Sequence, residues 1–292
     1  MYNFTDLAIR LTPGSLLAFV SRNQWRSPIL RRLCSYGASR FKRRTKTIPH
    51  GIGRGLRFNT GNSHSSFAFG THKFEVQKVL AAILRPGMSY YDVGANVGFF
   101  AVLAARLLNP EDSVICFEPV PENVSQINYN ARLNNFANVS VLGVALGRDE
   151  RTESFYTSHE PTWGNLASVG RLPAENSGEI TVTVRTLDSV RDANRLPPPA
   201  LIKIDVEGAE VEALQGATST IRNCRPILVI ELHGTNDAVS DILEGLGYVA
   251  VVLGDSAPVR NAHWNANIIA FPANSSDLVE LAAKLPKSDP DR

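Results

Sequence analysis

The sequence predicts an α/β domain of the doubly wound type, in which helices cover both faces of a mostly parallel sheet. Strand-like and helix-like segments alternate along the chain from about residue 74. The strand-like segments are continuous apolar runs, which are typical of parallel strands buried on both faces. With 292 residues, of which 43% are hydrophobic and 20% charged, the chain can bury a sizeable core.

The first elements of this domain are well marked. Residues 74–84 (FEVQKVLAAIL) show the apolar spacing of a helix, and Arg-Pro-Gly ends it. Residues 89–93 (SYYDV) form a short apolar strand, and residues 98–108 (GFFAVLAARLL) form the next helix. A strand over residues 113–119 (SVICFEP) follows. These segments predict the start of a parallel sheet.

Proline and glycine mark the later elements. A helix over residues 121–135 begins at Pro121, since proline suits the first helical turn. We expect further strands over residues 139–146, 201–206, 226–232, 248–253 and 267–271, and further helices over residues 208–223 and 237–247. Two more strand-like segments, 152–157 and 179–187, flank a long polar loop that contains His159 and Trp163. A loop of this length is usually functional or disordered, and we interpret His159 as a solvated residue.

The net charge of +2 is unevenly distributed. Residues 1–57 hold twelve Lys or Arg and one acid, so they carry 12 − 1 = +11 and the rest carries 2 − 11 = −9. We expect a basic arm over residues 1–57, a domain over residues 58–272 and a loose tail over residues 273–292. The arm suits peripheral contact with an anionic membrane surface, contact with a phosphorylated glycan carrier, or a solvated extension. We expect no nucleic acid partner, because the remaining chain is acidic.

Cysteine usage and hydropathy indicate the cytoplasm. Cys34, Cys116 and Cys224 are far apart and form no C-x-x-C pair, which argues against a disulfide framework or a zinc site. The chain has no apolar run of about 18 residues, and its start lacks the early positive segment of a signal peptide. We therefore expect a cytoplasmic protein, which the basic arm can bring to the inner membrane surface.

The turn after the first parallel strand carries a D-x-G-x-N-x-G motif, from Asp92 to Gly98. Ligands of doubly wound sheets bind at such turns, where glycines permit close approach to the backbone and the next helix offers free N–H groups. The spacing departs from the G-x-G-x-x-G of dinucleotide sites, and an acid repels a pyrophosphate. Asp92 suits a cationic ligand instead, such as S-adenosylmethionine, whose carboxylate end Asn96 can hydrogen-bond.

Glu118 strengthens this interpretation. It ends the next strand, twenty residues after Gly98. An acid at that position can accept hydrogen bonds from both ribose hydroxyls of a nucleoside. The turn and Glu118 together predict a binding site for S-adenosylmethionine.

The sequence resembles the FkbM-type family of S-adenosylmethionine-dependent methyltransferases. The resemblance covers roughly residues 70–254 and rests on DVGANVGFFAVLAARLL, VICFEPVPENVSQINYNARLN, RPILVIELHG and, most specifically, KIDVEGAE. It implies the seven-stranded, Rossmann-like sheet of class I methyltransferases, with residues 267–271 as an antiparallel last strand. It also implies O-methylation of hydroxyl groups on natural products or glycans.

The resemblance also implies roles for single residues. Gly94, Ala95 and Asn96 would line the methionine moiety, and Gly98 would complete the turn. The remaining cofactor-binding residues would be Asp92 at the ammonium or the turn, Glu118 at the ribose, Ala145 near the adenine, Asp205 above the methyl group and Glu75 as a closing contact.

Three polar residues at strand ends are candidates for catalysis. Asp205 lies near the end of the strand over residues 201–206. Glu231 lies near the end of the strand over residues 226–232 and His233 directly follows it, so alternation places these two on one face. Methyl transfer to an alcohol needs an aligned nucleophile and a group that accepts its proton. We expect one of the three to be the base. A divalent cation held by all three is a second option, and Glu210 is interpreted as a structural acid at a helix start.

Other functions stay open at this point. A nicotinamide-dependent oxidoreductase shares the fold class, although the glycine spacing disfavours it. A non-catalytic binding protein would retain the fold, but the intact acids at Asp92, Glu118 and Asp205 argue against it. N-methylation, the identity of the acceptor and the oligomeric state do not follow from the sequence.

Overall fold

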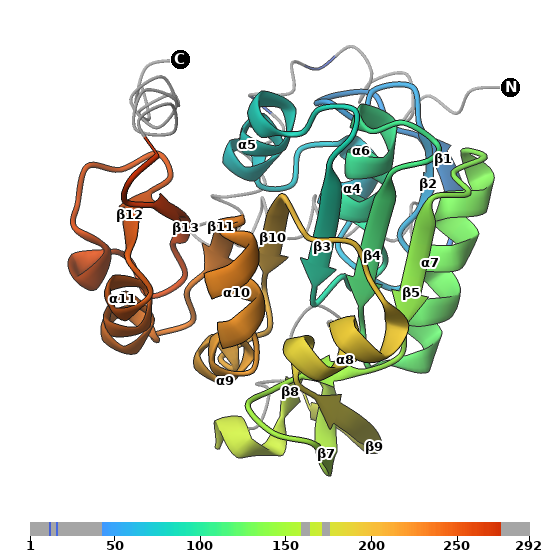
Figure 1. Cartoon of the computed structure of the whole chain (residues 1–292). Coiled ribbons are helices and arrows are strands. Elements are labelled where there is room, and N and C mark those ends of the chain that lie inside the picture. The colour runs from blue at the N-terminus through green and yellow to red at the C-terminus, as the bar shows by residue number, and fades with distance from the viewer. Residues whose placement is uncertain (1–11, 13–15, 17–42, 159–163, 171–175, 276–292) are drawn as a thin grey trace, which may run out of the picture.

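A seven-stranded sheet with helices on both faces forms the centre of the computed structural model, which describes residues 12, 16, 43–158, 164–170 and 176–275 (Figure 1). In spatial order the strands are β12 (Tyr248–Val252), β13 (Asn267–Pro272), β11 (Ile227–Glu231), β10 (Leu201–Ile204), β3 (Ser89–Val93), β4 (Ser113–Phe117) and β5 (Val139–Leu142). Neighbours from β11 to β5 are parallel, whereas β13 runs antiparallel to β11 and β12. This confirms the predicted doubly wound sheet and its antiparallel last strand.

Strand order reverses between β3 and β10. From β3 the chain builds the sheet outward through β4 and β5, and it then returns to place β10 on the other side of β3. Such a switch point leaves room for a ligand beyond the carboxyl ends of the two central strands. Both predicted functional motifs follow these two strands.

Two hydrophobic clusters cover the two faces of the sheet. On one face, alternate strand residues such as Tyr90 and Cys116 pack against α5 (Phe74–Ile83), α6 (Phe99–Leu107) and α7 (Pro121–Leu133). The opposite face is covered by α8 (Leu187–Asn194), α9 (Glu210–Gln215), α10 (Thr218–Cys224) and α11 (Asn236–Gly245). Because successive side chains of a strand point to opposite faces, the continuous apolar strands supply both cores. No helix within the described residues is long and apolar enough to cross a bilayer.

A smaller second sheet lies beyond the carboxyl ends of β3 and β4 (Figure 1). Its strands lie in the spatial order β6 (Ala145–Leu146), β9 (Asn176–Arg185), β7 (Arg151–Ser158) and β8 (Asn165–Leu166). The 3-10 turn η2 (Ala167–Val169) directly follows β8. Arg151 joins this sheet to the main domain through an ion pair of 2.6 Å with Glu212 of α9. The second sheet therefore borders the edge at which the functional motifs end.

Two predicted elements are wrong in extent. The strand expected over residues 139–146 is divided at Gly143, because β5 pairs with β4 in the large sheet whereas β6 pairs with β9 in the small one. The helix expected over residues 208–223 is divided into α9 and α10 near Gly216. A Cβ atom on Gly216 would lie 1.9 Å from the carbonyl oxygen of Gly147, so the backbones meet there. Helix α8 was not predicted; the Thr186 side chain caps it by accepting from the Ser189 N–H at 3.1 Å.

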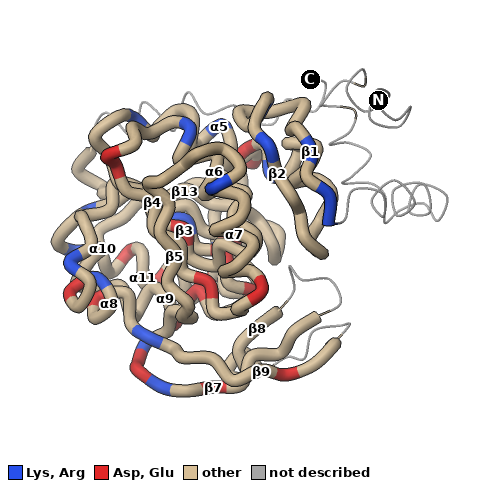
Figure 2. Tube along the Cα trace, turned by 90° about the vertical axis from the view of Figure 1, so that its right-hand side faces the viewer, with Lys and Arg blue, Asp and Glu red and all other residues tan. Residues whose placement is uncertain are grey.

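A hairpin precedes the large sheet. Strands β1 (Thr45–Thr47) and β2 (Arg57–Asn59) each carry one basic residue, Lys46 and Arg57 (Figure 2), and the short α4 (Ser66–Phe69) follows. The amide of Asn134, directly after α7, bonds both backbone groups of Arg57 at 2.8 Å, and the buried Asn130 in α7 bonds those of Asn59 at 2.9 Å. The expected boundary between residues 57 and 58 therefore falls inside a hairpin that packs on the domain.

Candidate active site

The ends of β10 and β11 bring the three candidate catalytic residues together. Asp205 directly follows β10, Glu231 is the last residue of β11, and His233 lies two residues further on. One ligand atom from each residue lies within 4.8 Å of the others. Parallel neighbours end at the same edge of a sheet, so this convergence follows from the fold. Their convergence is confirmed, and their catalytic roles stay predictions.

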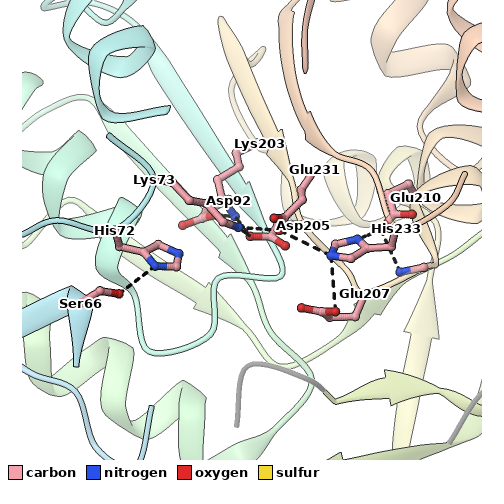
Figure 3. Close-up of polar contacts among 11 residues, drawn as sticks. Ser66, His72, Lys73, Asp92, Lys203, Asp205, Glu207, Glu210, Glu231 and His233 are labelled. Atoms are coloured by element: carbon pink, nitrogen blue, oxygen red, sulfur yellow. Dashed lines mark hydrogen bonds and ion pairs between the residues drawn. The ribbon is translucent and has the colours of Figure 1, made fainter. Parts of the chain in front are cut away.

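Two lysines complete this cluster (Figure 3). The ammonium of Lys73 donates to Asp205 at 2.7 Å and to Glu231 at 2.5 Å. The buried Lys203 lies 3.2 Å from Asp205 and 3.3 Å from Asp92. Burial would raise the pKa of Asp205, but the charges of Lys203 and Lys73 hold that pKa well below its usual value. Asp205 is therefore an ionised carboxylate at neutral pH.

The sequence interpretation missed both lysines. Lys203 carried a usable signal, because it lies in β10 two residues before Asp205, and alternation places both side chains on one face. Lys73 carried none, since it precedes α5 and is 132 residues away from Asp205 in the chain.

A buried carboxylate orients His233 (Figure 3). Glu210, the fully buried first residue of α9, accepts from the ring Nδ1 at 2.8 Å, and it also accepts from Thr235 at 3.0 Å. The ring Nε2 lies 3.5 Å from Glu231 and 3.4 Å from Glu207. Burial lowers the pKa of His233, but the Glu210 hydrogen bond and the charges of Glu207, Glu210 and Asp205 outweigh this effect and raise the pKa to about 9. The interpretation of Glu210 as a helix-start acid was incomplete, because its carboxylate faces the candidate site.

The glycines of the D-x-G-x-N-x-G turn are required by packing within the protein. Gly94 has φ +74°, and a Cβ atom there would lie 2.0 Å from the carbonyl oxygen of Asp205. Gly98 has φ +80°, and its Cβ atom would lie 3.0 Å from Ile127 of α7. Gly94 thus allows the ends of β3 and β10 to approach each other, and Gly98 allows the start of α6 to approach α7. The sequence pattern alone had indicated close approach by a ligand at both glycines.

Glu118 joins the turn to the end of β4. One carboxylate oxygen accepts from the Asn96 N–H at 2.8 Å, and the other accepts from the Val120 N–H at 3.0 Å and the Asn123 amide at 3.2 Å. Burial raises the pKa of Glu118 to about 7, although the hydrogen bonds act in the opposite direction. The carboxylate is held in one orientation beside the turn, as a ribose ligand should be. Ribose binding itself stays a prediction.

The other predicted cofactor residues have mixed surroundings. Asp92 is 1% exposed, and Lys203 is its ionic partner among the described residues. Its contact with a cofactor ammonium stays a prediction. Ala95 and Ala145 are buried, and Ala145 pairs with Val184 of the small sheet. Glu75 lies on the first turn of α5, and its role as a closing contact stays a prediction.

An exposed aromatic residue borders the cluster. Trp264 is 54% exposed, its ring centroid lies 6.3 Å from that of His233, and its carbonyl accepts from the Gly234 N–H at 2.7 Å. The loop residues His159 and Trp163, which the sequence singles out, lie outside the described residues.

Comparisons with known proteins point to one kind of enzyme. A family model described as a methyltransferase FkbM domain matches residues 92–250, just over half of the chain. The hexuronic acid methyltransferase AglP of Haloferax volcanii is 26% identical over 147 residues, which are 50% of this chain and 56% of AglP. The 31-O-demethyl-FK506 methyltransferase FkbM of Streptomyces tacrolimicus is 28% identical over 200 residues, 59% of this chain and 76% of that protein.

A solved structure gives a further comparison. The methyltransferase FkbM from Methylobacillus flagellatus KT is 19% identical, with a TM-score of 0.45 over 71% of this chain and 47% of that chain.

Proposed function

Because the chain belongs to the FkbM methyltransferase family, we propose that it transfers the methyl group of S-adenosylmethionine to a hydroxyl oxygen of a sugar or another natural product. The observation that carries this proposal is the convergence of Asp205, Glu231 and His233 beside the turn after β3. The family is one of methyltransferases, so a nicotinamide-dependent oxidoreductase is no longer favoured.

The residues at the switch point fit S-adenosylmethionine. Glu118 is held beside Asn96, where it can accept hydrogen bonds from a ribose. Asp205 places negative charge where the cationic end of the molecule would lie, and its carboxylate remains partly exposed. When bound, S-adenosylmethionine supplies a methyl group on a positively charged sulfur.

The acidic cluster suits proton removal from an alcohol. In the reaction the acceptor oxygen forms a bond to the methyl carbon, the carbon–sulfur bond breaks, and the alcohol proton must leave. Glu231 and His233 lie 3.5 Å apart, so either an ionised Glu231 or a neutral His233 can take the proton, and an ionised Glu231 can stabilise the imidazolium that forms on His233. Glu210 fixes the ring of His233 through Nδ1 and leaves Nε2 directed at Glu231.

Two observations favour a sugar acceptor. The relative AglP is named as a hexuronic acid methyltransferase. In this chain the exposed indole of Trp264 lies beside His233, and an aromatic face can pack against the C–H groups of a sugar ring while the hydroxyls reach the polar cluster. A hydroxyl on another natural product is the second candidate, because FkbM of Streptomyces tacrolimicus is named for methylation of a demethylated FK506.

Incubation with methyl-labelled S-adenosylmethionine tests the proposal. The protein is mixed with hexoses, hexuronic acids and an extract of its host, and labelled products are identified by mass spectrometry. An O-methylated sugar supports the proposal, and a methylated amine would contradict O-transfer. Cofactor binding by calorimetry without turnover on any acceptor would favour a non-catalytic binding protein.

Replacing Glu118 with alanine should weaken S-adenosylmethionine binding by roughly 10- to 100-fold, because each hydrogen bond to a charged group contributes about 1.5–3 kcal/mol. Isothermal calorimetry measures this change. Glu122→Ala is the matched control, since this acid is exposed on the first turn of α7. Equal affinity of the Glu118 and Glu122 variants would remove Glu118 from the binding site.

The pH dependence of kcat/KM should follow the protonation state of His233. With its pKa raised to about 9, His233 is protonated at pH 7 and accepts a proton more readily as the pH rises. We therefore expect kcat/KM to increase from neutral pH toward pH 9. In Glu210→Gln the acid that raises the pKa is removed, so the rise should shift to lower pH by about one unit or more. An unchanged profile in this variant would mean that Glu210 does not act through His233.

The cellular setting is also a proposal. We propose that the protein acts in the cytoplasm, where the free thiols of Cys116 and Cys224 would persist. The charge of residues 1–57 supports peripheral contact with an anionic inner membrane surface. Binding of the full chain to vesicles with and without anionic lipid tests this contact.

A further inference from the structure

Lys73 stands in an unusual position at the candidate active site. It directly precedes α5 and has φ +43° and ψ +64°, in the left-handed region that residues other than glycine rarely adopt. Its ammonium reaches Asp205 at 2.7 Å and Glu231 at 2.5 Å. Backbone strain of this kind is kept where the surrounding contacts hold it, and it often marks a functional residue.

The same carboxylates belong to a set that could hold a metal ion. Asp205, Glu231 and His233 offer two carboxylate oxygens and one imidazole nitrogen within 4.8 Å of one another. Oxygen and nitrogen donors of this kind suit several divalent cations. Lys73 bonds to two of the three donors, however, so a metal ion at the same oxygens would meet its ammonium at close range. Like charges at such distances repel each other, and Asp205 already has a second ammonium, that of Lys203, at 3.2 Å.

We propose that the ammonium of Lys73 serves as the cation of this site in place of a divalent metal ion, and that it binds the acceptor oxygen and stabilises the charge that develops as its proton leaves. This inference rests on the proposed function. An ammonium has three N–H donors, and the bonds to Asp205 and Glu231 use two of them. The third is available to the acceptor oxygen.

The charges around Lys73 keep it protonated. Burial would lower its pKa, but Asp205 and Glu231 outweigh this effect and raise the pKa far above its usual value. Lys203 and His72 also face the group, and Lys203 shares Asp205 with it. Lys73 therefore remains an ammonium throughout the reaction, and the proton of the acceptor passes to Glu231 or His233.

Manganese binding tests the proposal without any acceptor. We expect wild-type protein to show no Mn²⁺ site by electron paramagnetic resonance titration, whereas Lys73→Gly should bind one Mn²⁺ at least about tenfold more tightly. Glycine suits the left-handed backbone at this position, so the change removes the ammonium without adding strain. The site should disappear when Glu231→Gln is added. Wild-type protein that binds one Mn²⁺ as tightly as Lys73→Gly would overturn the proposal.

Turnover measurements provide a second test of the proposal. Wild-type turnover should be unaffected by EDTA, Lys73→Gly should lose roughly 100-fold in kcat, and Mn²⁺ should restore part of the loss. Lys78→Ala is the matched control, because this lysine is exposed on α5, the helix that Lys73 precedes. Loss of wild-type turnover in EDTA with recovery on addition of Mg²⁺ or Mn²⁺ would overturn the proposal. Failure of the proposed function would appear instead as no turnover on any acceptor, while the manganese titration still reports on Lys73.

Discussion

Replacing His233 with asparagine should lower kcat by roughly 10²- to 10⁴-fold, which corresponds to about 3–5 kcal/mol of lost transition-state stabilisation. The ring is the partner of Glu231 at 3.5 Å and is oriented by Glu210 at 2.8 Å, and asparagine cannot take or hold the acceptor proton. Steady-state kinetics with the identified acceptor measure the loss. Cofactor affinity should change little, because His233 lies at the end of β11 and away from Glu118 at the end of β4.

A second histidine provides the control for this experiment. His263 is exposed next to Trp264, and its ring centroid lies 6.0 Å from that of Trp264. His263→Asn should keep a near-normal kcat. If His233→Asn and Glu231→Gln both retained wild-type turnover, the assignment of proton transfer to this pair would fail.

Gly94→Ala should have the largest effect on stability. The new methyl group would lie 2.0 Å from the carbonyl oxygen of Asp205, on a residue with φ +74°. Left-handed backbone costs an alanine about 1–2 kcal/mol, and overpacking adds about 1–3 kcal/mol. We expect a loss of about 2–5 kcal/mol, which lowers the Tm by roughly 5–15 °C in a domain of this size. Thermal unfolding by circular dichroism measures the change.

The steric part of this effect can be separated with Gly170→Ala. Gly170 has φ +72°, and a Cβ atom added there would meet no atom of the described residues within 4 Å, so its alanine variant carries only the backbone cost. The Gly94 variant should also lose turnover, since Asp205 moves when its backbone is displaced. A Tm for Gly94→Ala equal to that of Gly170→Ala would show that the backbone of Asp205 moves away from the new methyl group without a steric cost.

Local pattern was sufficient for most of the fold. Continuous apolar runs predicted β3, β4, β10 and β11, and Pro121 marked the first residue of α7. It failed where contacts from distant segments decide the boundaries. Gly216 interrupts a helical pattern because the Gly147 backbone lies against it, and nothing near Gly216 in the sequence indicates this contact.

The order of residues along the chain was enough to predict that Asp205, Glu231 and His233 meet at one edge beside Asp92 and Glu118. Period-two alternation and parallel pairing place residues at strand ends without further information. The charge states of these groups, in contrast, depend on the folded arrangement. Lys73, Lys203 and Glu210 reach them from other segments, and electrostatic interactions act through space at distances of a few ångströms, whatever the separation along the chain.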